Sequence, residues 1–225
     1  MTADEGTDSR PERHVAPQRR VGRPPKADSV RRREEIIAAA RRRFAVHGYA
    51  STTLSVVAQD VGISLAALYH YFDDKQELYE AVFDESIEAA WSAARRRAEA
   101  GREKQSGLFA FVHAINEAGT DLDSRDERAT NMFLTTAPIE AARHDELKHL
   151  LDKRAKVQDR EIRSIVTPLF EAGELPAFDD IETAIDAIRI IIMGWSLETF
   201  LNRGRTPPHF AAMNAILEHL AMQPS

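Results

Sequence analysis

The sequence predicts an all-α fold, and three observations lead to that prediction. Apolar residues recur at spacings of three and four through most of the chain after residue 30, as on one face of a helix. Glycine and proline interrupt this pattern at intervals that fit single helices. No segment alternates apolar and polar residues as a half-buried strand would. We therefore expect a disordered arm, followed by packed helices in a small first domain and a larger second domain.

The first predicted helix covers residues 30–47. Its apolar face consists of Ile37, Ala40 and Phe44, at spacings of three and four. Gly48 marks its end, because glycine readily adopts the left-handed conformation that closes many helices. A second, shorter helix follows, with a buried stripe at Leu54, Val57, Ala58 and Val61.

A glycine turn separates this helix from the next one. Gly62 supplies the positive φ of the turn, and Ser64 is a suitable N-cap for a helix from Leu65 to about Tyr71. Two short helices joined in this way form a helix-turn-helix, which places its second helix in the major groove of DNA. With the preceding helix, residues 30–74 are predicted to form a three-helix DNA-binding domain.

Residues 75–225 are predicted to form a second, entirely helical domain. Asp74 and Glu77 have the spacing of a capping box, which indicates a helix start at Lys75. Pro138 is expected to interrupt a helix because proline has no backbone N–H. The predicted helices cover residues 75–101, 105–121, 125–136, 139–173, 179–204 and 207–221.

Residues 30–80 resemble a known family. The motifs that carry the resemblance are Gly48-Tyr49, Thr52-Thr53, Val57-Ala58, Val61-Gly62-Ile63-Ser64, Leu68-Tyr69-His70-Tyr71-Phe72, Lys75 and Leu78. Their order is similar to that in the N-terminal domain of the tetracycline-repressor (TetR) family of bacterial regulators. Beyond residue 80 only the size and the helical pattern are similar. The resemblance implies an all-helical homodimer that binds operator DNA and, in most members, releases it when a small molecule binds the C-terminal domain.

Charge is distributed unevenly along the chain. Residues 10–53 contain 12 Lys and Arg against 4 Asp and Glu, a net charge of +8. Residues 76–225 contain 17 against 26, a net charge of −9. Because local cations displace the counterions of DNA, we expect the basic segment to face the duplex in spite of the overall charge of −6.

Residues 1–29 are predicted to form a disordered basic arm, since they contain four prolines and few apolar side chains. The segment from Arg20 to Lys26 resembles an AT-hook, whose Gly-Arg-Pro core lies in the minor groove of A·T-rich DNA. Arg20, Arg23 and Lys26 are the expected contacts, because a narrow minor groove attracts cationic side chains. The alternative is a basic tail that touches phosphates only.

The two helices of the helix-turn-helix and the residues beside them supply the predicted DNA contacts: Thr52, Thr53, Ser64, Leu65, Ala66, Ala67, Tyr69, His70 and Lys75. No Arg, Lys, Asn or Gln lies between Ser64 and Phe72, so this helix lacks the side chains that make bidentate contacts to bases. We therefore expect sequence preference to come from apolar contacts, DNA shape and the arm. N-capping by Thr53 and core packing by Tyr69 are the alternative roles.

An effector site is predicted within residues 75–225, where aromatic and methionine side chains suit an apolar cavity and a few polar ones suit anchors. The candidate contacts are Trp91, Phe109, His113, Asn116, Met132, Phe133, Phe170 and Trp195. Thr135 and Arg154 are further polar anchors to consider. For each residue, ordinary packing or a surface position is the alternative.

The segments 179–204 and 207–221 are predicted to form the homodimer interface. A seam at spacings of three and four joins Ile181, Ile185, Ile188, Ile192, Trp195 and Thr199, and a second joins Phe210, Met213, Leu217 and Leu220. The first segment is also apolar on its other side, at Ile190, Ile191, Met193, Leu197 and Phe200. Such a helix must be covered on both sides, by its own domain and by a partner. A wholly intrachain core is the alternative.

The sequence carries no signal for catalysis or for a bound cofactor. It has no cysteine, no nucleophile constellation, no phosphate-binding loop and no His-Glu-x-x-His metal motif. We therefore expect no enzyme activity, no catalytic residue, no metal and no cofactor. No apolar run approaches the roughly 20 residues of a membrane span, so we expect no membrane partner and a cytoplasmic protein that joins the nucleoid when bound to DNA.

The predicted function is therefore a ligand-responsive, dimeric transcriptional regulator. We expect a repressor that a small apolar or amphipathic effector releases from its operator. The alternative is an architectural DNA-binding protein that uses the hook-like arm and does not switch.

Overall fold

The structure is a computed structural model that describes residues 26–101, 125–201 and 210–221. Helices are the only regular elements in these residues. In chain order they are α1 (Lys26–Ser51), α2 (Leu54–Asp60), α3 (Leu65–Leu68), α4 (Lys75–Gly101), α6 (Arg125–Arg143), the 3₁₀ helix η1 (Asp145–Leu147), α7 (His149–Glu171), α8 (Ile181–Leu201) and α9 (Phe210–Ala221). The all-α prediction is confirmed for these residues. None of these helices is both long and apolar enough to span a bilayer.

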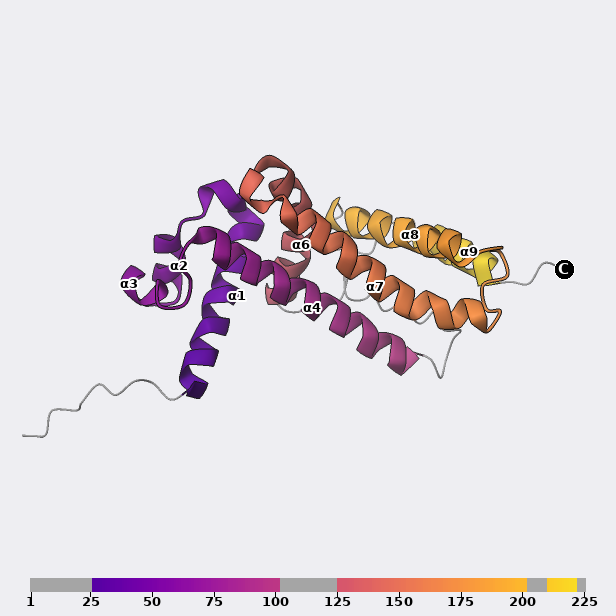
Figure 1. The fold of residues 1–225 in the computed structure, drawn as a ribbon, viewed down its shortest axis with the longest axis horizontal. Helices are drawn as coiled ribbons and strands as arrows, with labels where there is room; N and C mark the ends of the chain where they lie inside the picture. Colours follow the sequence, from indigo (N-terminus) through magenta and orange to yellow (C-terminus); the bar gives the residue numbers. More distant parts are fainter. Residues whose placement is uncertain (1–25, 102–124, 202–209, 222–225) are drawn as a thin grey trace, which may run out of the picture.

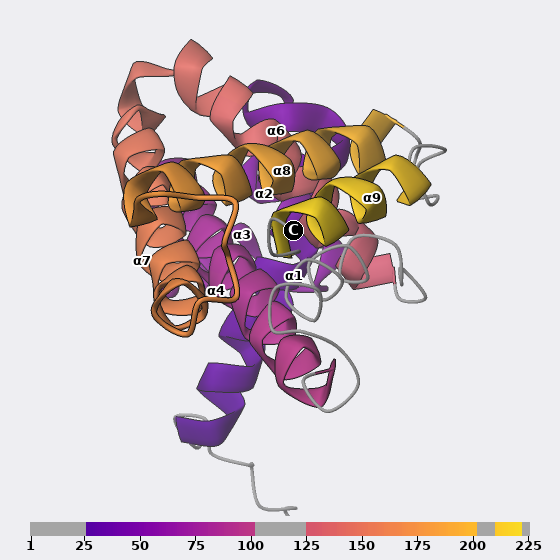
Figure 2. The ribbon, with the colours of Figure 1, turned by 90° about the vertical axis from the view of Figure 1, so that its right-hand side faces the viewer.

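The helices gather into two groups that α4 connects. Figure 1 shows α1, α2 and α3 at one end of the molecule, and α8 and α9 toward the other. Figure 2 shows α9 beside α8. Polar side-chain contacts join α4 and α7 in matching order: Glu80 with His149, Asp84 with Lys153, and Arg95 with Glu161. The matching order means that these two long helices run side by side in the same direction.

The predicted caps define the small helices of the first group. The Thr53 hydroxyl accepts a hydrogen bond from the Val56 amide at 3.4 Å and so begins α2. Gly62 follows α2 with a φ of 68°, a left-handed conformation that a side chain would disfavour. The Ser64 hydroxyl accepts from the Ala67 amide at 3.1 Å and begins α3. The local sequence therefore specifies the helix-turn-helix as predicted.

One apolar core runs from the first group into the second. The Phe44 ring of α1 meets the Tyr79 ring of α4 edge-on at 4.8 Å between centroids. Tyr79 in turn lies 5.0 Å from the Phe133 ring of α6. All three side chains are buried in the same cluster of apolar residues. Because aromatic contacts of this kind stabilise both partners, a displacement of α6 must disturb the packing of α1.

The predicted helix break at Pro138 is wrong, since α6 continues through this residue to Arg143. Pro138 cannot donate the backbone hydrogen bond that the Leu134 carbonyl would receive in a regular helix. The Arg154 guanidinium of α7 replaces that donor, with 2.6 Å between Nη1 and the Leu134 oxygen. The sequence contains no local sign of this replacement, because the donor lies on another helix.

Further boundaries differ from the predictions. The predicted helix over 139–173 is divided between the end of α6, η1 and α7. Helix α1 begins at Lys26, so residues 26–29 of the predicted arm are helical. Helix α3 ends at Leu68, and the next residues form a turn that the backbone amides of Tyr71 and Phe72 close onto the Leu68 carbonyl. The predicted helix over 105–121 lies outside the described residues.

Candidate functional site

The outward side of α3 is small and uncharged. Leu65 is 38% exposed, Ala66 is also exposed, and Tyr69 is 49% exposed just after the helix. Leu68 points the other way and is completely buried. Because α3 has only four residues, this burial and the Ser64 cap must hold it in place. The arrangement presents aliphatic groups and a phenol to a partner, which suits contacts with thymine methyl groups and phosphates.

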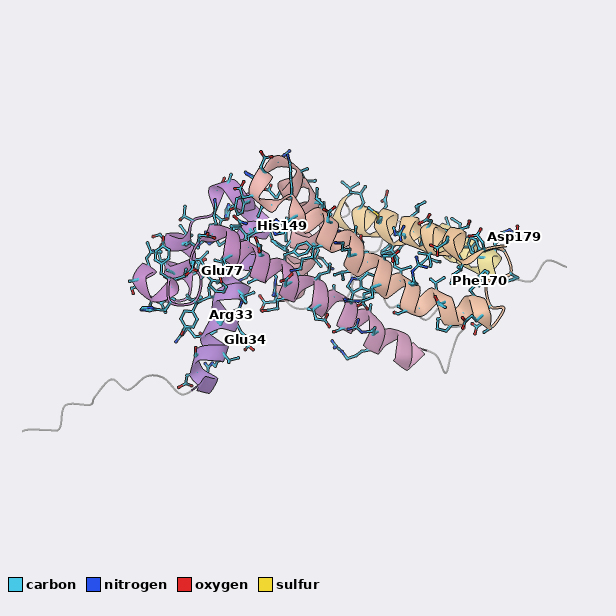
Figure 3. All side chains as sticks on the ribbon, viewed as in Figure 1. Arg33, Glu34, Glu77, His149, Phe170 and Asp179 are labelled. Atoms are coloured by element: carbon cyan, nitrogen blue, oxygen red, sulfur yellow. The ribbon has the colours of Figure 1, made fainter. Side chains whose placement is uncertain are left out.

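Two basic side chains of α1 make contacts with the helix-turn-helix and the turn that follows it. Arg43 makes two hydrogen bonds to the Asp60 carboxylate of α2, at 2.5 and 2.6 Å. These bonds hold the pKa of Asp60 below its usual value. The Arg33 guanidinium lies 5.0 Å above the Phe72 ring, close to the turn after α3, as Figure 3 shows for Arg33. Both contacts hold α1 against the helix-turn-helix. They therefore stabilise the position of α3 and do not add charge to its outward side.

The predicted phosphate contacts also carry structural roles. Thr52 is buried, and its hydroxyl donates to the Gly48 carbonyl at 2.9 Å. The Lys75 ammonium donates to the Tyr49 carbonyl at 3.0 Å and lies 4.2 Å from the centre of the Tyr49 ring. Thr53 and His70 are exposed at the surface of the same domain. DNA contact by any of these side chains remains a prediction.

A capping box begins α4 next to Lys75, as predicted. The Asp74 carboxylate accepts from the Glu77 amide at 2.8 Å, and the Glu77 carboxylate accepts from the Asp73 amide at 2.6 Å. Figure 3 labels Glu77 at this helix start. Two carboxylates at the first turn also interact favourably with the helix dipole. The start of α4 is therefore rigidly defined beside the reader elements.

The junction between the two helix groups contains an acidic side chain that the sequence analysis did not identify. Glu140 of α6 accepts a hydrogen bond from the Tyr49 amide at 3.0 Å. Its carboxylate also lies against Gly48, where an added Cβ would come within 3.2 Å of Oε1. His144 completes the junction, 3.6 Å from the Glu140 carboxylate and 4.9 Å from the Tyr49 ring. A lone glutamate in an ordinary helix gives no sequence signal for this role.

Tyr49 is the residue on which the junction converges. Burial and the nearby Glu146 carboxylate raise the pKa of Tyr49 to about 12, so its phenol is neutral near pH 7. Lys75 and Glu140 hold its backbone carbonyl and amide respectively. The start of the helix-turn-helix is thus held between α4 and α6. These two helices connect α1, α2 and α3, which we call the head, to the rest of the chain.

The candidate effector contacts lie in different environments. Trp91, Phe133 and Trp195 are buried, whereas Met132 is exposed and Phe170 is partly buried. Figure 3 places Phe170 near the end of α7 that lies away from the helix-turn-helix. Phe133 packs on Phe44 and Tyr79, and so belongs to the core between the two groups. Phe109, His113 and Asn116 lie outside the described residues, as do Arg20 and Arg23 of the arm.

Lys26, the last predicted residue of the arm, is the first residue of α1. The long helix therefore begins at the end of the hook-like segment. Contact between this segment and DNA remains a prediction.

The two sides of α8 have different surroundings, and the predicted seam is the inner one. Ile185, Ile188 and Trp195 are buried within the chain, so this seam cannot be the surface offered to a partner. The opposite side carries apolar residues that the chain leaves exposed: Ile190, Met193, Leu197 and Leu201. Gly194 is exposed on the same side, with no atom within 4 Å of an added Cβ. We refer to these five residues as the outer face of α8.

Comparisons with known proteins agree with this geometry. The family model "Bacterial regulatory proteins, tetR family" matches residues 36–82. The transcriptional repressor ComR of Escherichia coli (strain K12) is 24% identical over 154 residues, 68% of this chain and 72% of ComR. The transcriptional regulator BetI of Burkholderia cenocepacia is 40% identical over 84 residues, but the match spans only 43% of BetI and 37% of this chain.

A solved structure extends the likeness to most of the chain. The transcriptional regulator FadR from Bacillus subtilis, in complex with stearoyl-CoA, has a TM-score of 0.61 at 21% identity. The match covers 85% of this chain and 99% of the FadR chain. At this level of identity the likeness concerns the fold.

Proposed function

We propose that this chain, which belongs to the tetR family of bacterial regulatory proteins, is a ligand-responsive repressor that binds operator DNA as a homodimer. The chain is a DNA-binding transcriptional regulator and not an enzyme, as its matches with ComR and BetI indicate. The observation that carries the proposal is the exposed α3 within the matched segment, supported on its inner side by Leu68. Repression, dimer formation and response to an effector are the parts that go beyond the family match.

The outer face of α8 supports dimer formation. Ile190 is 71% exposed, and the face continues over three turns of the helix. An exposed apolar stripe of this kind marks an interaction surface. A twofold axis through this face would present two copies of α3 to the two halves of a palindromic site. In the proposed dimer α9 completes the interface beside α8.

The path of the signal follows from the contacts of α6. An effector among the helices of the second domain would move α6, and α1 would follow because the two helices share the Phe44–Phe133 packing and the Glu140–Tyr49 hydrogen bond. Arg42 of α1 adds an ion pair with Asp126 of α6 at 2.7 Å. Such a movement would change the spacing of the two α3 helices, which must match major grooves about 34–36 Å apart. The effector then releases the operator by favouring the mismatched spacing.

The effector class suggested by this domain is small and apolar or amphipathic. Buried Trp91 and Trp195 supply aromatic surface to the domain. FadR, which has a similar fold, binds stearoyl-CoA, a molecule with a long apolar chain and a charged end. Neither observation identifies the molecule, so the effector is proposed as a class only.

Footprinting on genomic fragments, combined with sedimentation, tests the proposal. We expect a protected site with dyad symmetry and a stoichiometry of one dimer per site. A continuous, asymmetric coating of A·T-rich DNA would instead indicate the architectural protein. A dyad footprint that no apolar or amphipathic compound weakens would retain the regulator and remove the effector response.

The arm is proposed to add minor-groove contacts through Arg20, Arg23 and Lys26. Removing residues 1–25 should weaken binding to operators with A·T-rich flanks roughly tenfold more than to those with G·C-rich flanks. Gel shifts with the two flank types measure this difference. Equal losses would indicate contacts with phosphates alone.

A further inference from the structure

We propose that Arg154 binds the anionic group, a carboxylate or a group of similar charge, of an amphipathic effector. The inference rests on the ligand-responsive function proposed above and names the chemistry of its ligand. It starts from a half-buried cation for which none of the described acidic residues is a partner.

Arg154 lies on the side of α7 that faces the core. Leu150, one turn before it, is buried, and Val157, one turn after it, packs against the same apolar cluster. The guanidinium crosses to α6 and donates to the Leu134 carbonyl at 2.6 Å. The pKa of Arg154 is lowered by burial, yet an arginine in a protein keeps its charge.

Glu161 provides a comparison on the same helix. It lies seven residues after Arg154 on the same side of α7, and it is buried, whereas Arg154 is half-buried. Its carboxylate is neutralised by Arg95 of α4 and by Arg160, the latter at 2.9 Å. Arg154 has no such partner, because none of the described acidic residues lies within ion-pair distance of it. Among the described residues, arginines therefore balance the buried charge of Glu161, whereas the half-buried charge of Arg154 has no acidic partner.

The structural role of Arg154 explains only part of its chemistry. Pro138 leaves the Leu134 carbonyl without a donor, and one N–H of Arg154 supplies it. A guanidinium has five N–H donors in a planar fork that fits a carboxylate with two parallel bonds. A neutral side chain would satisfy the carbonyl without burying a charge. The remaining donors and the net charge thus point to an anion from outside the chain.

The surroundings of the guanidinium indicate the rest of the ligand. Phe133 and Ala137, which flank Leu134 on α6, are both buried apolar residues. A ligand that reaches Arg154 between α6 and α7 must therefore carry an apolar body beside its anionic group. Binding there would pull on α6 at the turn before Glu140, the residue that holds Tyr49. The proposed anchor thus lies on the helix through which the signal is proposed to pass.

The test separates the structural role of Arg154, as the donor to the Leu134 carbonyl, from its proposed role in binding an anion. Pro138→Ala restores a backbone donor to the Leu134 carbonyl, so Arg154 is no longer needed as its partner. Arg154→Met is then made in the Pro138→Ala protein, with Lys156→Met in the same background as the control. Lys156 is exposed on the same helix, and its loss changes the net charge equally. Thermal unfolding should show similar stabilities for the three proteins.

Two pairs of probes compare an anion with a neutral molecule of the same skeleton: decanoate with decan-1-ol, and 1-naphthoate with 1-naphthylmethanol. Calorimetric titration of the full-length dimer measures their affinities. In the Pro138→Ala protein and in the Lys156→Met control, we expect at least one acid to bind roughly ten- to hundredfold more tightly than its alcohol. In the Arg154→Met protein this preference should disappear.

Three results would overturn the anion site. They are equal affinity of acid and alcohol in the Pro138→Ala protein, a preference that persists without Arg154, and no binding of any of the four probes. Operator release, measured in parallel, tests the proposed function separately. Alcohols that bind and release DNA as well as the acids do would retain the function and reject the anion site. Arg154-dependent binding with no effect on DNA would retain the site and reject the function.

Discussion

The outward side of α3 and the core-facing side of α7 differ in the charge that they carry. In the head, Arg43 and Asp60 pair with each other near the surface, and the outward side of α3 carries no charge. In the domain behind it, Arg154 and Glu161 of α7 turn their charged groups toward the interior. An exposed ion pair contributes little free energy, whereas a buried charge is costly unless a partner balances it. The outward side of α3 thus suits the surface of a partner, and the core-facing side of α7 carries the charge at which a ligand anion is proposed to bind.

The outer face of α8 differs most from the rest of the second domain, since it is apolar, exposed and, in the proposed dimer, in contact with a partner. Ile190→Glu combined with Leu197→Glu should prevent dimer formation, because the charges would be buried without partners. A monomer holds one half-site only, so operator affinity should fall roughly 100-fold or more. Sedimentation and gel shifts measure the two effects.

Ala155→Glu with Ala177→Glu is the matched control, since it adds the same charge at two exposed positions elsewhere. This control should remain a dimer. A stable, operator-binding dimer of the α8 variant would mean that the interface lies on another face.

The junction is where the two regions meet, and Gly48 is its most constrained residue. It has a φ of 74° and a ψ of 175°, a combination that residues with a Cβ rarely adopt. In Gly48→Ala the new Cβ would also lie 3.2 Å from Glu140 Oε1. We expect a loss of about 1–3 kcal/mol in the free energy of unfolding, measured by chemical denaturation.

Gly62→Ala serves as the control for a positive φ without a close contact. Gly62 has a φ of 68°, but no atom lies within 4 Å of an added Cβ. The cost there should be smaller, about 1 kcal/mol. Equal losses at the two glycines would show that the contact with Glu140 adds nothing to the stability of the junction.

Lys75 tests whether a charged side chain of the head contacts DNA. Its ammonium is bonded to the Tyr49 carbonyl at the edge of the domain and is also the predicted phosphate contact. Lys75→Met should weaken binding to all DNA sequences alike and reduce the salt slope of log K by about one unit. Titrations over a range of salt concentrations measure the slope.

Lys156→Met, on the exposed side of α7, is the matched control and should leave the slope unchanged. An unchanged slope in the Lys75 variant would assign this lysine to the junction alone.

The smallest expected effect concerns the surface pair of the head. Hydrogen bonds from Arg43 lower the pKa of Asp60 in the folded state. The stabilisation is therefore present above the unfolded pKa of about 3.9, and it is lost as the pH falls through the folded value. Asp60→Asn should slightly flatten the acid side of the stability profile, and exposed Asp152→Asn should change it less. Identical profiles for wild type and Asp60→Asn would remove this pair from the stability of the head.

Local signals account for what could be predicted of the fold and of the site. The caps at Thr53, Ser64 and Asp74 form where the sequence indicates them, because each cap requires only its own next turn. The prediction of a helix break at Pro138 was wrong because a side chain of α7 supplies the hydrogen-bond donor that proline lacks. The role of Glu140 was not predicted, because its partner is a backbone amide 91 residues away.

The sequence by itself determined the helical class, the helix-turn-helix and the uncharged reading surface, since helix periodicity, glycine turns and residue chemistry are properties of short segments. The tertiary structure alone decided which side of α8 is covered, because both sides are apolar and only packing distinguishes them. It also decided that, among the described residues, Glu161 has arginine partners and Arg154 has no acidic partner, because such pairing depends on which helices meet.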